Sequence, residues 1–428
     1  MLLKIIIFLI SIYIIKYNHK HNLRVAYYTY SLKGGGTERV TALFINYLSV
    51  ESDFDIYLFS QKKKEKLEYK IPQNIQRIKI NGNEIISTKN LKKKLLTKKI
   101  DVFIYQFPYG NEIKMLNKLK NVKIIIFSHF CFLTWIYFYQ THCFKELYNA
   151  YKESKYIVTL VPFENDYIFK KWGIKSILMN NLITYEYDEI NPSNLSSKII
   201  LMIGRGSDKY KRFSLGIKSM KYIEQKIPES EMKILSDLKG LNELEDLVKS
   251  LNLEKKVSFI GYTLNPEEYF KNASLHIFPT ISEAFPMVLS ETKIFGIPNI
   301  LTGLDFVSMS KGGTVIIYDD KPETIGKEAI KILIDTQYRK KLGKEARESM
   351  KNFKNKLTIK KWIKFIISVY KDEGNFQNFS GTENKINEME LKKILINQVK
   401  LLKIREPFFR NITEKLLLNF TYLENILN

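Results

Sequence analysis

The sequence predicts an α/β protein of two domains, each with an open parallel sheet covered by helices on both faces. At 428 residues the chain is longer than one ordinary hydrophobic core requires. Short, almost wholly apolar runs alternate with helical ones, which is typical of parallel strands buried on both faces. This alternation stops at the polar stretch 191–198 and then restarts. The restart indicates a second domain.

The first domain is expected over residues 22–190. Its strand-like runs are 23–30, 53–60, 101–107, 122–128 and 155–161. A helix is expected over 37–50, directly after a glycine-rich turn, because its apolar residues recur at helical spacing. The basic stretch from Lys62 to Lys99 interrupts the pattern and is predicted to be an excursion of charged helices or loops at the surface.

The second domain, with its closing helices, is expected over residues 191–372. Its strand-like runs are 198–204, 231–236, 256–262, 274–280, 297–303 and 313–319. Helical patterns follow over 322–350 and 357–373. Two such domains that face each other form a cleft between the carboxyl ends of their sheets, where open α/β folds bind ligands.

Two segments lie outside these domains. Residues 1–21 begin with an apolar run of fifteen residues, which as a helix would span about 22 Å, less than the ~30 Å hydrocarbon core of a bilayer. A signal peptide, a short membrane anchor and a buried element are all open; a short anchor or interfacial helix is favoured because no small-residue cleavage site follows. The basic residues after it would keep the bulk of the chain cytoplasmic, at the cytosolic membrane face. Residues 373–428 form a basic amphipathic tail that suits a membrane surface, a partner helix or the chain's own domain.

The charge balance is strongly basic. Lys and Arg number 68 against 45 Asp and Glu, a formal net charge of +23. Such an excess favours anionic partners, of which a membrane surface and a phosphorylated substrate are expected and nucleic acid is not, because RNA-recognition and zinc-finger signatures are absent. A compositional bias toward Lys, Asn and Ile is the alternative explanation. The two cysteines, Cys131 and Cys143, form no CxxC pair, which argues against a disulfide framework or a structural zinc site.

The first candidate site is the glycine-rich turn of Gly34, Gly35 and Gly36 between the first strand and its helix. Glycines let the backbone approach a ligand, and a helix N-terminus offers free N–H groups to phosphate. A dinucleotide site is the rival interpretation, but Arg39 stands where its third glycine should be. Asp53 and Asp55 lie at a distance suited to a ribose and also spell a DxD metal motif; a structural role at the start of a strand is favoured for both.

The second and third candidates follow strands of the second domain. Arg205 and Lys211 flank a polar turn after Gly204, and two cations at the end of a parallel strand suit a diphosphate. Lys209 and Arg212 are close enough to leave open which of the basic side chains acts.

The third candidate is the stretch PTISEAFPMVLSETKIFG, residues 279–296. Pro286 in the first turn of a helix would leave Glu283 in the preceding loop and Glu291 one to two turns inside. The two carboxylates would then reach different parts of one ligand. Backbone N–H groups of Phe285, Met287 and Val288 would point to the same place.

Taken together, these motifs resemble the retaining GT-B glycosyltransferases of family 4, the glycosyl transferases group 1. The resemblance covers about residues 23–372 and depends on the order and spacing of three motifs, of which the E-x7-E pair is the most specific. It implies a GT-B fold of two Rossmann-like domains facing across a cleft. It further implies transfer of a hexose from a nucleotide-diphosphate sugar to a glycan or lipid-linked acceptor, with retention of configuration and without a metal or other cofactor.

The resemblance also implies roles for individual residues. Arg205 and Lys211 would bind the donor diphosphate, and Glu291 would hold the donor ribose. Glu283 and the backbone N–H groups of Phe285, Met287 and Val288 would hold the transferred sugar, with Pro286 among the donor-binding residues. The loop from Gly34 to Gly36 would close over the diphosphate and the acceptor, with Gly35 and Gly36 contacting the donor. His129 matches the place of an active-site histidine near the sugar.

One feature departs from the family pattern, and one alternative function stays open. The family's glycine turn after the second strand of the donor domain is replaced by the sequence of residues 233–243. The alternative function is a catalytically inactive, membrane-associated scaffold or binding subunit of the same fold. The charged residues Arg205, Lys211, Glu283 and Glu291 argue against this alternative, because a scaffold does not need all four.

Overall fold

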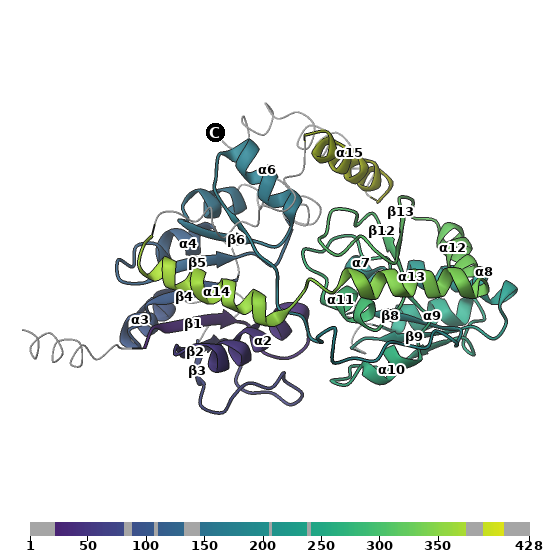
Figure 1. The fold of residues 1–428 in the computed structure, drawn as a ribbon, viewed down its shortest axis with the longest axis horizontal. Helices are drawn as coiled ribbons and strands as arrows, with labels where there is room; N and C mark the ends of the chain where they lie inside the picture. The colour runs from purple at the N-terminus through teal and green to yellow at the C-terminus, as the bar shows by residue number, and fades with distance from the viewer. Residues whose placement is uncertain are drawn as a thin grey trace, which may run out of the picture.

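The computed structural model describes residues 22–80, 88–106, 110–131, 146–204, 208–237, 241–373 and 388–405. These residues form two lobes, each built on one parallel sheet (Figure 1). The predicted α/β fold of two parallel-sheet domains is therefore confirmed. The apolar segment 1–21 and the tail beyond residue 405 lie outside the described residues.

The sheet of the first domain contains, within the described ranges, seven parallel strands in the order β3-β2-β1-β4-β5-β6-β7. The strands are β1 (Arg24–Thr29), β2 (Asp55–Ser60), β3 (Gln76–Lys79), β4 (Val102–Tyr105), β5 (Lys123–Phe127), β6 (Tyr156–Thr159) and β7 (Ile177–Leu178). Its helices are α2 (Gly36–Glu51), α3 (Thr88–Thr97), α4 (Gly110–Leu116) and α6 (Pro162–Trp172). Strands β4 and β6 are buried along their whole length, and β1 and β5 along all but their first residue, as their largely apolar sequences require.

The sheet of the second domain has, in the described part of the chain, six parallel strands in the order β10-β9-β8-β11-β12-β13. The strands are β8 (Ile199–Ile203), β9 (Glu231–Leu235), β10 (Val257–Phe259), β11 (Leu275–Phe278), β12 (Asn299–Thr302) and β13 (Thr314–Ile317). Its helices are α7 (Asp208–Lys211), α8 (Phe213–Lys226), α9 (Asn242–Ser250), α10 (Glu267–Asn272), α11 (Met287–Ile294), α12 (Pro322–Ile334) and α13 (Thr336–Ser349).

The strand order of each sheet reverses at one point. In the first sheet β1 and β4 are neighbours, and the chain moves outward from them in opposite directions; β8 and β11 occupy the same position in the second sheet. Loops that leave neighbouring strands at such a switch point separate to opposite faces of the sheet, and a ligand-binding crevice forms between them. The glycine-rich turn follows β1, the Lys211 segment follows β8, and the Glu283 loop follows β11.

Two helices near the C-terminus pack against other parts of the chain. Helix α14 (Asn355–Tyr370) leaves the second domain and packs against α2 of the first, where Trp362 is fully buried (Figure 1). Helix α15 (Glu388–Arg405) lies against the loop after β12: Gln398 Nε2 donates to the carbonyl of Gly303 at 2.5 Å. This described part of the tail thus docks on its own chain.

The main strands and helices predicted from the sequence are present, and the basic excursion contains more order than expected. Its residues 76–79 form β3, an edge strand that pairs with β2, and Thr88–Thr97 form α3. β3 is at most half-buried, so its sequence QRIK lacks the apolar run that identified the other strands. The short strand β7 was not predicted either.

Candidate functional site

The glycine-rich turn reaches across to helix α11 of the other domain. Gly34 adopts φ +88, a conformation that favours glycine, and its carbonyl accepts a hydrogen bond from Tyr69 Oη at 2.9 Å. Gly35 precedes α2 as its N-cap, and Gly36 begins the helix. A Cβ placed on Gly36 would lie 3.6 Å from Cγ of Met287, the first residue of α11. The turn and the N-terminus of α11 therefore lie together at the junction of the two domains.

Lys211 is held in position by three neighbours. Its ammonium contacts a carboxylate oxygen of Glu283 at 2.5 Å and lies 5.3 Å from the ring centroid of Phe278. Its alkyl stem passes Gly204 so closely that a Cβ there would be 3.1 Å away. The preceding carbonyl of Tyr210 accepts hydrogen bonds from the Ile281 amide at 3.2 Å and from a threonine hydroxyl of the same loop at 3.1 Å. The segment after β8 and the loop after β11 thus form one structural unit.

The other basic residues near Lys211 differ in their surroundings. Arg212 donates to Asp320 at 2.6 Å, and both side chains are largely buried. This ion pair occupies the guanidinium of Arg212 on the α8 side of the turn. Lys211 is therefore favoured over Arg212 as the cation that binds a ligand. Arg205 lies outside the described residues, and the side chain of Lys209 is not described.

The two carboxylates of the E-x7-E pair occupy different surroundings. Glu283 lies in the loop before α11, where it accepts from Thr280 Oγ1 at 3.2 Å as well as from Lys211. Pro286 is the N-cap of α11 and Glu291 lies in its second turn, only 1% exposed. Oε1 of Glu291 accepts hydrogen bonds from the guanidinium of Arg39 and, at 2.7 Å, from Thr184 Oγ1. Each carboxylate therefore has its own cation, Lys211 from its own domain and Arg39 from the other.

Helix α11 begins without a side-chain cap. The amides of Met287 and Val288 belong to its first turn, whose N–H groups have no acceptor within an α-helix. Phe285 is buried just before the helix, with its ring 6.0 Å from that of Phe353. This helix N-terminus lies beside Gly36 and is suited to an anionic or hydroxyl-rich ligand.

His129 follows β5 and is half-buried, with its ring 4.2 Å from that of Phe127. Burial lowers the pKa of its imidazole to about 3, so the ring is neutral at physiological pH. Its Nε2 has no hydrogen-bond partner among the described residues. A neutral histidine with a free ring nitrogen can accept or donate one hydrogen bond, but it cannot act as a fixed cation.

We expect the stability of the protein to fall between pH 6.5 and 4.5 through two histidines, the buried His276 and the half-buried His129. Burial lowers the pKa of His276 to about 4, as it lowers that of His129. Because both folded pKa values lie below the unfolded value, the unfolded chain takes up protons first, and the stability present above pH 6.5 is lost as pH falls. Each histidine should cost about 2.5 kcal/mol by pH 4.5.

Urea unfolding at pH 7, 5.5 and 4.5 measures this loss. His276→Gln keeps an amide near Asn299, the partner of His276 Nδ1 at 2.7 Å, but does not titrate. The variant should lose roughly half of the histidine-dependent slope. Identical pH slopes for variant and wild type would contradict the assignment.

Asp53 and Asp55 lie far from this junction in the fold. β2 begins at Asp55, so both carboxylates are at the amino end of that strand, whereas the glycine-rich turn follows the carboxyl end of the neighbouring β1. A ribose held in a dinucleotide site requires an acidic residue at the carboxyl end. The structural role favoured for these two residues agrees with this placement.

Arg39, Thr184 and Lys293 were not identified as site residues from the sequence. Arg39 was considered only as an obstacle to dinucleotide binding; its position one turn into α2, after a glycine-rich turn, is the signal that it faces the same ligand region. Lys293 is buried in α11 and donates to the carbonyls of Met309 at 2.6 Å and Lys311 at 2.5 Å. Burial lowers its pKa to about 7. It holds the loop after β12 against α11.

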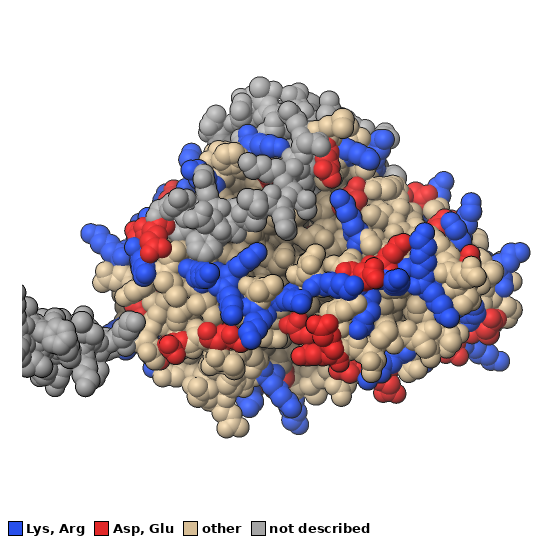
Figure 2. All heavy atoms as spheres, viewed as in Figure 1, with Lys and Arg blue, Asp and Glu red and all other residues tan. Residues whose placement is uncertain are grey.

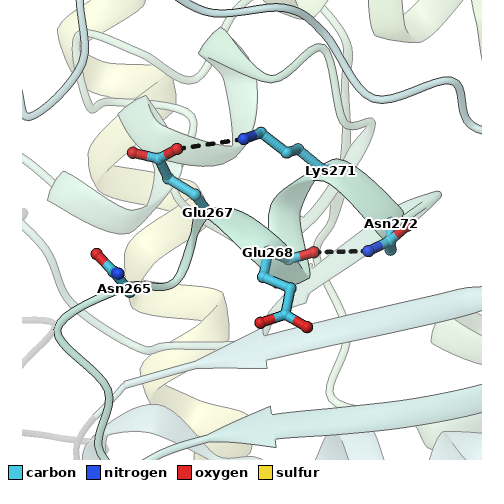
Figure 3. Close-up of a pocket in the computed structure, with 5 residues that line it drawn as sticks. All are labelled: Asn265, Glu267, Glu268, Lys271 and Asn272. Atoms are coloured by element: carbon cyan, nitrogen blue, oxygen red, sulfur yellow. Dashed lines mark hydrogen bonds and ion pairs between the residues drawn. The ribbon is translucent and has the colours of Figure 1, made fainter.

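A surface pocket on α10 lies apart from the two switch points (Figure 3). Its lining side chains are engaged along their own helix: Lys271 contacts Glu267 at 3.4 Å, and Asn272 Nδ2 donates to the carbonyl of Glu268 at 2.8 Å. None of the predicted site residues lines it. The junction between the domains is therefore favoured over this pocket as the functional site.

Comparison with known proteins supports the same region. The family described as Glycosyl transferases group 1 matches residues 184–349, which include Lys211, Glu283 and Glu291. An uncharacterized glycosyltransferase of Haemophilus influenzae is 28% identical over 185 residues, 42% of this chain and 50% of that protein. The match therefore spans about half the length of that relative.

A second relative is similar over more of its length. The N-acetylgalactosamine-N,N'-diacetylbacillosaminyl-diphospho-undecaprenol 4-alpha-N-acetylgalactosaminyltransferase of Campylobacter jejuni is 26% identical over 297 residues, 63% of this chain and 78% of that enzyme.

Solved structures share the fold of nearly the whole described chain. Sucrose-phosphate synthase from Thermosynechococcus elongatus superposes with a TM-score of 0.69 at 14% identity, covering 82% of this chain and all of that one. HepE from Anabaena, solved with UDP and glucose, gives 0.65 at 13% identity over 81% of this chain. Residues 184–349 therefore match the glycosyl transferases group 1, and the two-sheet architecture of the chain is a GT-B-like fold shared with these solved structures.

Proposed function

We propose that this glycosyltransferase moves a hexose from a nucleoside-diphosphate sugar to a glycan or lipid-linked acceptor, with retention of anomeric configuration. The observation that carries the proposal is the convergence of Gly36, Lys211 and the Glu283/Glu291 pair at the two switch points, from three loops and two domains. The acceptor class is supported by the Campylobacter relative, whose name contains a diphospho-undecaprenol. A nucleoside-diphosphate donor is supported by the UDP and glucose bound to HepE.

In the proposed complex the donor spans the N-terminus of α11. Its diphosphate meets Lys211, Arg205 and the amides of Gly35 and Gly36. The transferred sugar contacts Glu283 and the peptide groups from Phe285 to Val288. The ribose diol donates to Glu291. Lys211 would exchange its contact with Glu283 for the diphosphate, leaving that carboxylate to accept sugar hydroxyls.

The proposed reaction requires no protein nucleophile. The acceptor oxygen attacks the anomeric carbon from the face that the diphosphate leaves, and a leaving phosphate oxygen accepts its proton. Lys211 and the first-turn amides of α11 stabilise the negative charge that develops on the diphosphate, because they are already oriented by the fold. Glu283 lies where it can balance positive charge on the sugar, and neutral His129 can hold one sugar hydroxyl.

An anionic membrane surface is the proposed location of the acceptor, at the cytosolic face. Within the described ranges, no helix has both the length and the apolar character needed to cross a membrane. Lys and Arg side chains gather where α13 and α14 cross one face of the molecule (Figure 2). The exposed lysines of these helices include Lys340, Lys344, Lys356, Lys360, Lys361 and Lys364. Such a surface attracts anionic lipid headgroups in a salt-dependent way.

A nucleotide panel tests the proposal. Calorimetry with UDP, GDP, ADP and NAD should give selective binding of one nucleoside diphosphate. Glu291→Ala should weaken that binding about 10- to 100-fold, because hydrogen bonds to a charged acceptor are lost. Arg205→Ala should weaken it as well. Glu68→Ala, which removes a buried carboxylate paired with Arg77 in the first domain, is the control and should bind as wild type does.

Turnover is then measured with sugars of the selected base and an acceptor placed in anionic or in uncharged vesicles. Faster transfer in anionic vesicles, lost at high salt, would support the membrane location. No nucleotide binding by a well-folded wild-type protein would contradict the enzyme function and favour the inactive scaffold.

A further inference from the structure

The cation that meets Glu291 comes from the opposite domain. Arg39 lies in α2 of the first domain and Glu291 in α11 of the second, 252 residues apart in the sequence. Their side chains are 17% and 2% exposed. Thr184, in the segment between the domains, donates to the same Oε1 atom at 2.7 Å. In this structure one oxygen of Glu291 is therefore shared by an arginine and a threonine.

Arg39 is anchored to the glycine-rich turn. The guanidinium lies 5.1 Å from the ring centroid of Tyr69, and the Tyr69 hydroxyl donates to the carbonyl of Gly34. Burial by itself would lower the pKa of Arg39, but the charge of Glu291 and the contact with Tyr69 raise it above its ordinary value. Arg39 is consequently a fixed, fully charged group at the place where the donor diphosphate is proposed to lie.

This ion pair and the proposed ribose contact require the same carboxylate. If ribose hydroxyls donate to Glu291, they must compete with Arg39, which is the stronger electrostatic partner. When a ligand binds only one of two protein states, its apparent affinity falls as the fraction of protein in the other state rises. The cross-domain pair therefore lowers the apparent donor affinity while it holds the ligand-free domains together.

We propose that Arg39 is a positioning residue that occupies Glu291 in the absence of donor and is displaced from it by the ribose diol. The inference rests on the proposed donor site. It assigns to the first domain a direct influence on ribose binding in the second, through a residue that does not itself hold the ribose. The donor then replaces one cross-domain contact with its own contacts to both domains.

The test combines a protein variant with a ligand variant. Affinities for the selected nucleoside diphosphate and for its 2′,3′-dideoxy analogue are measured by calorimetry at pH 8. Arg39→Met keeps the alkyl stem beside Tyr69 and removes the competing charge. The variant should bind the nucleoside diphosphate about 3- to 10-fold more tightly than wild type, and the dideoxy analogue equally well. Only competition for the diol predicts this difference between the two ligands.

Two further variants test whether the effect of Arg39→Met comes from a general change in structure. Arg77→Met removes an arginine of similar exposure that pairs with Glu68 at 2.7 Å within the first domain, and should leave both affinities unchanged. Arg39→Lys keeps a charge without the planar fork and should give a smaller gain in the same direction; it also serves if Arg39→Met does not fold.

Three outcomes overturn the inference. Weaker binding of both ligands to Arg39→Met would make Arg39 a direct donor ligand. Equal affinities of variant and wild type for both ligands would make the ion pair purely structural, and an equal gain for both would remove the link to the ribose. Absence of nucleotide binding by wild type would instead be a failure of the proposed function.

Discussion

Lys211→Met is expected to reduce kcat/KM about 10²- to 10³-fold with little loss of stability. Lys211 is the described cation that follows β8 at the switch point, and its position is set by Gly204, Phe278 and Glu283. A fixed cation beside a leaving diphosphate stabilises charge that develops only in the transition state, and removing one such group costs about 3–4 kcal/mol of barrier. Its ammonium is partly exposed and its ion pair lies near the surface, so the fold depends on it little.

Arg212→Met is the matched control for this prediction. Arg212 is the adjacent residue in the chain, but its guanidinium pairs with Asp320. This variant should lower the free energy of unfolding while kcat/KM of the folded fraction stays within about threefold of wild type. Steady-state kinetics with the selected donor, together with urea unfolding, separates the two effects. If the large kinetic loss followed Arg212→Met instead, the donor cation would be misassigned.

The elements that the sequence predicts best are those whose own apolar residues indicate that they are buried. β4 is a continuous apolar run of four residues, and β11 has three apolar residues beside His276; both strands are completely buried. Their alternation with helices also predicted two parallel sheets. β3 could not be predicted in this way, because an edge strand with the sequence QRIK forms only where β2 offers an unpaired edge. Its pairing partner, not its composition, makes it a strand.

In the candidate site, too, local sequence predicts some features, whereas others depend on how distant parts of the chain pack. The spacing of Glu283 and Glu291 predicts a loop position and a helical position, and the structure has both. The partners of Glu291 could not be predicted, because Thr184 and Arg39 lie 107 and 252 residues away and their approach depends on how the two domains pack. Local motifs therefore predict the secondary structure around the two candidate carboxylates, whereas the contacts that Glu291 makes across the domains appear only in three dimensions.

The junction that creates these pairs depends on a helix from the end of the chain. α14 follows the second domain in sequence but covers the first, where the Trp362 ring lies 4.9 Å from Phe44 and 4.7 Å from Phe127. Its indole N–H also donates to the Asn180 carbonyl at 3.3 Å. Trp362 thus connects α14, α2, β5 and the segment that leads into the second domain.

Trp362→Ala is expected to lower the free energy of unfolding by about 3–5 kcal/mol, because it leaves a large cavity in the core and removes the donor to the part-buried Asn180 carbonyl. Leu357→Ala, at a position of the same helix that is 58% exposed, should cost less than about 0.5 kcal/mol. Urea unfolding followed by far-UV circular dichroism measures both. Because α14 holds the first domain to the second, the tryptophan variant should also bind the nucleoside diphosphate more weakly at temperatures where it remains folded. A Trp362→Ala protein as stable as Leu357→Ala would mean that α14 merely covers the first domain and does not fix the geometry in which Arg39 meets Glu291.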